Sequence, residues 1–175
     1  MPKLAATPES VSSKPADKRA VAAVAASGTV ATATTNFLEV YRADAMERVR
    51  MVKSGVPANA VEAMARRMAM PKDRLVGTLG LARATIDRKA RENKPLSTDE
   101  SSRVLGMARL VGQVQAMVEE SGNPQGFNAA QWVARWLERP LPALGGQRPA
   151  ELMDTPEGQA LVSQLVARMQ SGAYA

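Results

Sequence analysis

The 175-residue sequence contains no cysteine and no histidine. The absence of cysteine excludes a disulfide framework and thiolate chemistry. The absence of histidine removes the usual zinc sites and the commonest general base of enzymes. Acidic residues, lysine, serine and threonine are present, but their spacing suggests no combination of base, nucleophile and oxyanion-binding group. We therefore expect no catalytic residues, no metal site, no cofactor and no enzymatic activity.

Aromatic residues and long apolar segments are also scarce. Aromatic side chains make up only 3% of the sequence, too few for the stacking platforms that bind single-stranded nucleic acids. No apolar run approaches the roughly 20 residues of a membrane-spanning helix. The alanine-rich segment 20–26 follows Lys18 and Arg19 as in a signal peptide, but Glu9 and Asp17 precede it. We therefore predict a cytoplasmic protein without a membrane partner.

The positive charge is concentrated in one part of the chain. The whole sequence has a net charge of +6 and an isoelectric point near 10.1. Residues 1–41 carry four basic and three acidic side chains. Residues 42–112 carry fifteen basic and eight acidic side chains, and residues 113–175 carry four basic and six acidic side chains. The middle segment thus has a net charge of +7, and the C-terminal segment −2. Such a basic segment favours a polyanion, either nucleic acid or a membrane surface.

Composition and patterning divide the chain into three parts. Residues 1–36 are rich in Ala, Ser, Thr and Pro and have few large apolar side chains. Such a segment buries too little surface to offset the entropy lost on ordering, so we predict a disordered tail. Residues 37–97 form a basic helical unit, and residues 98–175 form a second helical unit.

Apolar residues recur at helical spacing throughout these two units, and no segment shows the pattern of a β-strand. The sequence therefore predicts an all-α fold. We expect helices over roughly 36–54, 58–68, 71–79, 82–92, 98–120, 129–138 and 156–171, with one short turn of helix at 149–153.

Three helix starts carry clear capping signals. Ser97 and Glu100 have the spacing of a capping box. Asn128 can cap the helix that follows it. Thr155, followed by proline and glutamate, combines a hydroxyl cap, a proline in the first position and a carboxylate in the first turn.

Residues 71–92 have the pattern of a helix-turn-helix. Two short helices at a fixed angle need a tight turn and apolar residues that hold them together. Leu75, Leu79, Leu81 and Ile86 can supply those contacts, and Gly80 can supply the turn.

The second helix of this pair is the candidate recognition helix. A helix fits the major groove of DNA, where arginine can bind guanine bidentately and lysine can neutralise phosphate. The alternative is a helix pair whose basic face is only solvated. The concentration of positive charge in the same segment favours DNA binding. The predicted DNA contacts are Arg83, Thr85, Arg88, Lys89 and Arg91.

The C-terminal unit has two further features. Trp132 and Trp136 are four residues apart and therefore share one helix face, either as core anchors or as an interface hot spot. Residues 170–175 follow the last predicted helix and include Tyr174, an aromatic residue with no helix beside it. A short end of this kind can enter the cleft of a partner.

The order of these segments resembles the Xre/MbcA/ParS-like antitoxins that accompany RES-domain toxins. Residues 79–88, LGLARATIDR, are similar to the family's recognition-helix region. Residues 95–103, PLSTDESSR, are similar to the start of its long helix. Residues 134–140 and 143–149, ARWLERP and ALGGQRP, resemble its next conserved segment. Ser102 departs from the aspartate common in the family, and residues 121–128 resemble an insertion.

This resemblance implies a function as well as a fold. It implies a cognate RES-domain toxin that consumes NAD or transfers ADP-ribose from it, and a C-terminal unit that covers the toxin's NAD pocket with the chain's end reaching in. It also implies a homodimer within a larger complex that binds operator DNA and represses its own promoter. The predicted toxin contacts are Trp132, Leu144, Gln170, Ser171, Gly172 and Tyr174.

Two other functions remain open on the sequence. The first is a helix-turn-helix transcriptional regulator whose C-terminal unit only dimerises. The second is a phage- or nucleoid-associated DNA-binding protein without a toxin. A RES-type reading frame beside the gene would favour the antitoxin.

Overall fold

The computed structural model describes residues 36–122 and 124–170. All regular elements in these two ranges are helical, as the sequence predicted, and the β-pairing found there is one isolated bridge between Pro57 and Pro95. The elements are α2 (Phe37–Arg42), α3 (Ala45–Ser54), α4 (Asn59–Arg67), α5 (Lys72–Thr78), α6 (Arg83–Arg91), α7 (Thr98–Glu120), α8 (Ala129–Leu137), η1 (Pro142–Leu144), η2 (Pro149–Leu152) and α9 (Pro156–Gln170).

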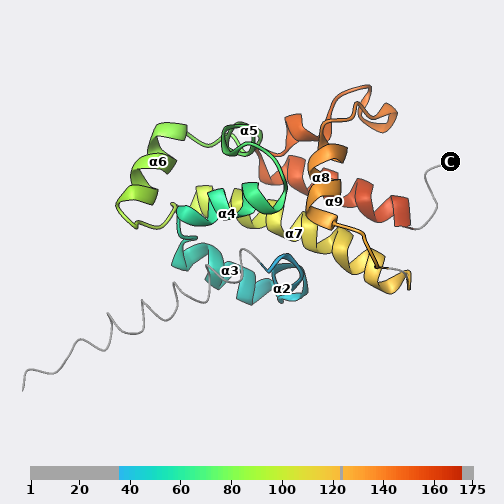
Figure 1. Cartoon of the computed structure of the whole chain (residues 1–175), viewed down its shortest axis with the longest axis horizontal. Coiled ribbons are helices and arrows are strands. Elements are labelled where there is room, and N and C mark those ends of the chain that lie inside the picture. Colours follow the sequence, from blue (N-terminus) through green and yellow to red (C-terminus); the bar gives the residue numbers. More distant parts are fainter. Residues whose placement is uncertain (1–35, 123, 171–175) are drawn as a thin grey trace, which may run out of the picture.

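The long helix α7 lies at the centre of the molecule (Figure 1). Helices α2 and α3 pack along it, as do α8 and α9. The sequence predicted one apolar stripe on this helix, formed by residues such as Val104 and Val111, and both are fully buried. Leu105, Leu110 and Ala116, outside that stripe, are buried as well. The reason is that α7 has neighbours on several sides instead of one.

Two glycines allow helices and turns to approach closely. A Cβ placed on Gly112 of α7 would lie 2.0 Å from the carbonyl oxygen of Phe37, where α2 crosses. A Cβ on Gly158 of α9 would lie 1.9 Å from the carbonyl oxygen of Leu152 in η2. In both places the nearest atom belongs to the backbone and cannot turn aside as a side chain can. Any larger residue would therefore push the two segments apart.

Polar contacts also tie α9 to α7. Gln113 is buried on α7, and its side-chain amide donates to the backbone oxygen of Ser163 at 3.0 Å and accepts from the Ser163 hydroxyl at 2.7 Å. The amide of Gln159 donates to the backbone oxygens of Arg103 and Met153 at 3.1 and 2.8 Å. These buried or half-buried hydrogen bonds fix the register between the two helices.

The three predicted caps are confirmed. Ser97 and Glu100 form the capping box of α7. The side chain of Asn128 accepts from the backbone of Gln131 at 3.0 Å, and the Thr155 hydroxyl accepts from the backbone of Gly158 at 3.1 Å. These contacts explain why α7, α8 and α9 begin close to their predicted starts.

The first predicted helix, over 36–54, is in fact two helices. The chain leaves helical geometry at Ala43, and Asp44 begins α3 with a capping box whose other member is Glu47. The prediction followed the apolar spacing and overlooked this second capping signal. The break turns α2 so that Phe37 and Val40 are buried against α7, whereas α3 has no fully buried residue.

A single hydrophobic cluster joins the N-terminal and C-terminal halves of the described chain. It includes Leu75 and Ile86 from the helix-turn-helix segment and Val133 and Val162 from α8 and α9. The predicted division into two helical units at residue 97 therefore stays a prediction.

The predicted tail falls almost wholly outside the described residues. No described helix has the length and apolar character needed to span a membrane.

Candidate functional site

Helices α5 and α6 form the helix pair that the sequence predicted. Leu75, Leu79, Leu81 and Ile86 are all buried between these helices and the core. Gly80 has a φ of +58°, a left-handed conformation that glycine adopts at little cost. The chain therefore reverses between the two helices at the position that the sequence indicated.

The outer face of α6 is basic. Arg83, Arg88 and Arg91 are exposed there. Arg83 pairs with Asp73 at 2.8 Å, and Arg88 pairs with Glu92 at 3.5 Å. Ion pairs between such exposed side chains add little stability, so DNA phosphates can replace the carboxylates as partners.

Asp87 lies among the basic groups of this face. The hydrogen bond from Lys72, at 2.5 Å, lowers the pKa of the Asp87 carboxyl, and the charges of Arg83 and Arg91 add to this effect. The carboxylate is therefore ionised at neutral pH and reduces the positive potential of α6. The Nε of Arg91 donates a hydrogen bond of 3.3 Å to the backbone carbonyl oxygen of Asp87.

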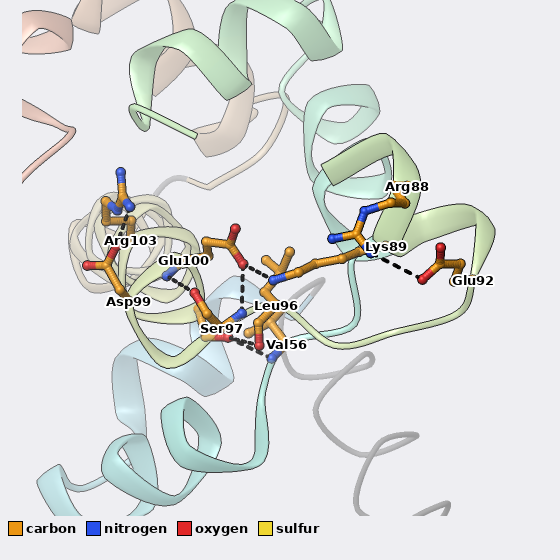
Figure 2. A network of polar contacts seen from close by, with 10 residues as sticks. Val56, Arg88, Lys89, Glu92, Leu96, Ser97, Asp99, Glu100 and Arg103 are labelled. Atoms are coloured by element: carbon orange, nitrogen blue, oxygen red, sulfur yellow. Dashed lines mark hydrogen bonds and ion pairs between the residues drawn. The ribbon is translucent and has the colours of Figure 1, made fainter. Parts of the chain in front are cut away.

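The other two predicted DNA contacts are less accessible. Thr85 is half-buried. Lys89 points toward the first turn of α7, where its Nζ lies 2.5 Å from Glu100 Oε2 (Figure 2). Its side chain is only 17% exposed, against 66% for Arg83. The phosphate contact predicted for Lys89 stays a prediction, but the structure gives this ammonium group an internal partner.

Glu100 is thus a member of two interactions. Burial raises the pKa of the Glu100 carboxyl, but the hydrogen bonds from Lys89 and from Ser97 outweigh burial, and the net pKa lies below the ordinary value. A carboxyl whose pKa is lowered by folding stabilises the folded state when it is ionised. This contribution is present above the ordinary carboxyl pKa and is lost as the pH falls through the lower pKa of the folded state.

We therefore expect Glu100→Gln to destabilise the protein by about 1–3 kcal/mol at pH 7. The difference from wild type should shrink as the pH falls below about 4.5, because the unfolded-state carboxyl is protonated first, and it should vanish once the pH is below the lower pKa of the folded state. Urea unfolding at several pH values measures this. Glu62→Gln is the control, since Glu62 lies on an exposed face of α4 and pairs with Arg66 at 3.6 Å. A constant difference across the whole pH range would contradict the assignment.

The second candidate surface is an aromatic cluster at α8. The rings of Trp132 and Trp136 are stacked with centroids 5.7 Å apart, and the Phe127 ring lies 6.3 Å from Trp132. Trp136 is buried and serves the core. Trp132 is half-buried, and Phe127 is 38% exposed. The sequence pointed to the two tryptophans but missed Phe127, although it lies only five residues before Trp132.

An apolar cavity of about 270 Å³ opens beside this cluster. It lies between α7, α8 and the last turns of α9, so the exposed Met169 is at its edge close to where α9 ends. The residues that line it are Val114, Met117, Val118, Phe127, Trp132, Val166 and Met169.

The remaining predicted toxin contacts are spread over the C-terminal half. Leu144 is half-buried at the end of η1, in a loop closed by a hydrogen bond from the Leu141 backbone to Gln147. Gln170 is the last residue of α9. Ser171, Gly172 and Tyr174 lie outside the described residues. Of the predicted toxin contacts, Trp132 lies close to the end of α9, because it lines the same cavity as Val166 and Met169.

A glycine-turned helix pair with outward-facing arginines belongs to the helix-turn-helix class. Residues 47–109 match the family model described as the antitoxin Xre-like helix-turn-helix domain. Residues 124–172 match that of the antitoxin Xre/MbcA/ParS C-terminal toxin-binding domain. The two matches lie on either side of the last turns of α7.

Comparison with individual proteins agrees with the family models. The chain is 47% identical to the Prs ADP-ribosylating antitoxin of Sphingobium sp. (strain YBL2) over 139 residues, which cover 79% of this chain and 87% of that relative. It is 23% identical to antitoxin Xre of Yersinia enterocolitica over 72% of this chain and 80% of that relative. The chain belongs to the Xre/MbcA/ParS antitoxin family.

Proposed function

We propose that the chain inhibits a RES-domain toxin that consumes NAD or transfers ADP-ribose, and that it represses its own promoter. The observation that carries this proposal is the 47% identity to a relative whose name is Prs ADP-ribosylating antitoxin. The match of residues 124–172 to a toxin-binding domain supports the first half. The exposed arginines of α6 support the second.

Inhibition requires that the antitoxin occupy or cover the toxin's NAD cleft. NAD carries a diphosphate, so its cleft presents hydrogen-bond donors and positive potential to the ligand. Residues 113–175 have a net charge of −2, which is complementary to such a cleft. We propose that the end of the chain, with Gln170, Ser171, Gly172 and Tyr174, enters the cleft, and that Trp132 and Leu144 contact its rim.

Operator binding requires that α6 enter the major groove. Arginine side chains at its exposed face can bind guanine, and the same side chains can pair with phosphates. We propose that Arg83, Arg88 and Arg91 make these contacts in a homodimer whose two α6 helices bind two half-sites. Thr85 is a further candidate at the edge of the same face.

The test combines partner capture with DNA binding. The intact chain is purified with its associated proteins from its host, and we expect a RES-domain protein to co-purify. The alternative, a regulator whose C-terminal unit only dimerises, predicts specific DNA binding with no such partner. The proposed toxin inhibition would be refuted if the chain captured no RES-domain protein and did not protect growing cells against the toxin encoded beside it.

The triple variant Arg83→Ala, Arg88→Ala, Arg91→Ala is expected to lose operator binding by at least about 100-fold, since each base-reading arginine contributes about 1–3 kcal/mol. It should still protect against the toxin. The control is Arg135→Ala, Arg139→Ala, Arg148→Ala, which changes net charge equally but lies outside the helix pair. Fluorescence anisotropy on promoter DNA at several salt concentrations measures both affinity and its salt slope. Equal losses in the two variants would refute the role of α6.

A further inference from the structure

Helix α6 has few contacts that could fix its orientation. Ile86 is its one fully buried residue. Most of its other side chains are exposed or half-buried, and its outer face points away from the core. A recognition helix must nevertheless hold its side chains at defined positions to read bases. The ion pairs of Lys72 with Asp87 and of Asp73 with Arg83 join α6 to α5. Contacts from outside this helix pair therefore have to set the angle of α6 to the core.

Lys89 and Glu100 provide the first of these contacts. Their side chains are 17% and 13% exposed, and they meet at 2.5 Å. Glu100 also accepts a hydrogen bond of 2.7 Å from the backbone of Ser97, so its carboxylate is held in place before Lys89 reaches it (Figure 2). The pair attaches the second half of α6 to the first turn of α7.

Arg103 provides the second contact. Its Nη1 donates to the backbone oxygens of Leu79 and Gly80 at 2.9 and 2.7 Å, and its Nη2 pairs with Asp99. Leu79 and Gly80 form the turn that leads into α6. The Arg103 side chain is 15% exposed. Both carbonyls accept from one nitrogen of the guanidinium group, while its second terminal nitrogen reaches Asp99. The single ammonium group of a lysine does not reproduce this forked arrangement.

The two contacts come from one side of a rigid element. Glu100 and Arg103 are three residues apart and therefore neighbours on the surface of α7. One binds the second half of α6, and the other binds the turn before it. Helix α7 is itself held in the core along most of its length.

We propose that Arg103 is a positioning residue for operator recognition, acting with Glu100 as a two-point clamp that orients α6 from α7. This inference rests on the proposed operator binding. Arg103 is not one of the proposed DNA contacts, because its guanidinium group is engaged with Leu79, Gly80 and Asp99. Its loss changes how accurately the α6 arginines meet base edges and leaves their charge, and hence the attraction to phosphates, unchanged. Discrimination between sequences then falls more than affinity for DNA in general.

The test uses Arg103→Met, which keeps an unbranched apolar stem but removes all donors. The matched control is Arg109→Met, the same change six residues further along α7 at an exposed position. The probes are a duplex that the wild-type chain selects from a random library and a scrambled duplex of equal length. Hydrogen exchange of the α6 amides, relative to those of α7, provides a second measurement that needs no DNA.

We expect Arg103→Met to lower the ratio of specific to non-specific affinity by about tenfold and to leave the non-specific salt slope unchanged. Its α6 amides should exchange faster than in wild type, toxin binding should persist, and Arg103→Lys should restore part of the ratio. A purely structural defect would instead lower both DNA affinities and toxin binding together, and would overturn the proposal. Full discrimination in a folded Arg103→Met variant would also overturn it. A wild-type chain that selects no sequence would refute the proposed operator binding itself.

Discussion

Truncation after Met169 is expected to abolish protection against the toxin while leaving operator binding within about twofold of wild type. The shortened chain ends one residue before the last residue of α9. The buried residues of that helix, Val162, Leu165 and Val166, all precede the cut, so the core is retained. What is lost is the segment that we propose enters the NAD cleft.

The expected size follows from the way that interfaces distribute their energy. A few residues dominate, and the best contribute about 2 kcal/mol or more each. Removal of Gln170, Ser171, Gly172 and Tyr174 together should therefore weaken toxin binding by at least about 30-fold. Co-expression with the toxin, scored by growth, measures protection, and a gel shift on promoter DNA measures operator binding. The α6 triple-arginine variant serves as the reciprocal control, because it should lose the gel shift and keep protection.

A truncated chain that protects fully would show that the end of the chain is not the inhibitory element. The surface around Trp132 and the loop 144–149 would then be the better candidate. Trp132→Ala tests that surface directly, although its stacking on the buried Trp136 also supports the fold. Thermal unfolding of this variant separates lost contact from lost stability.

The second large effect is expected from Gly112→Ala. The added Cβ would lie 2.0 Å from the Phe37 carbonyl oxygen and 2.7 Å from the Tyr41 Cβ, so α2 has to move away from α7. Overpacking of a core costs about 1–3 kcal/mol or more, whereas the higher helix propensity of alanine returns at most about 1 kcal/mol. We therefore expect a net loss of about 1–2 kcal/mol and a melting temperature lower by about 3–8 °C.

Gly77→Ala is the matched control for this variant. Gly77 lies in α5, and a Cβ there would meet no atom within 4 Å. Here alanine only removes conformational freedom from the unfolded chain, so we expect a gain of about 0.5–1 kcal/mol. Differential scanning calorimetry compares the two variants. If the two substitutions change the melting temperature in the same direction and by the same amount, α2 and α7 do not approach each other at Gly112 as closely as the structure shows.

Local physical chemistry explains why so much of the secondary structure could be predicted. Ser97, Asn128 and Thr155 act on backbone groups three residues away, so their effect is independent of the rest of the molecule. The same holds for Gly80, whose left-handed turn is a property of the single residue. The motif of the helix pair and the family resemblance followed from such local signals.

The partners of individual side chains could not be predicted in the same way. Lys89 and Arg88 are adjacent in the sequence and equally basic, yet Arg88 is exposed and Lys89 reaches Glu100 on α7. Helical spacing places Lys89 on some face of α6, but which face meets another element depends on where α7 passes. For the same reason the role of Arg103 at the turn was not visible from its position in the sequence.

The sequence by itself thus determined the helices, their caps, the helix-turn-helix and the family, because each depends on a residue and its near neighbours or on an ordered set of motifs. Only the tertiary structure decided that α7 is buried on several sides, that α2 crosses it at Gly112, and that Glu100 meets Lys89 of α6 while Arg103 meets the turn before it. These features join residues up to 75 positions apart, such as Phe37 and Gly112, and no local pattern encodes a contact over that separation.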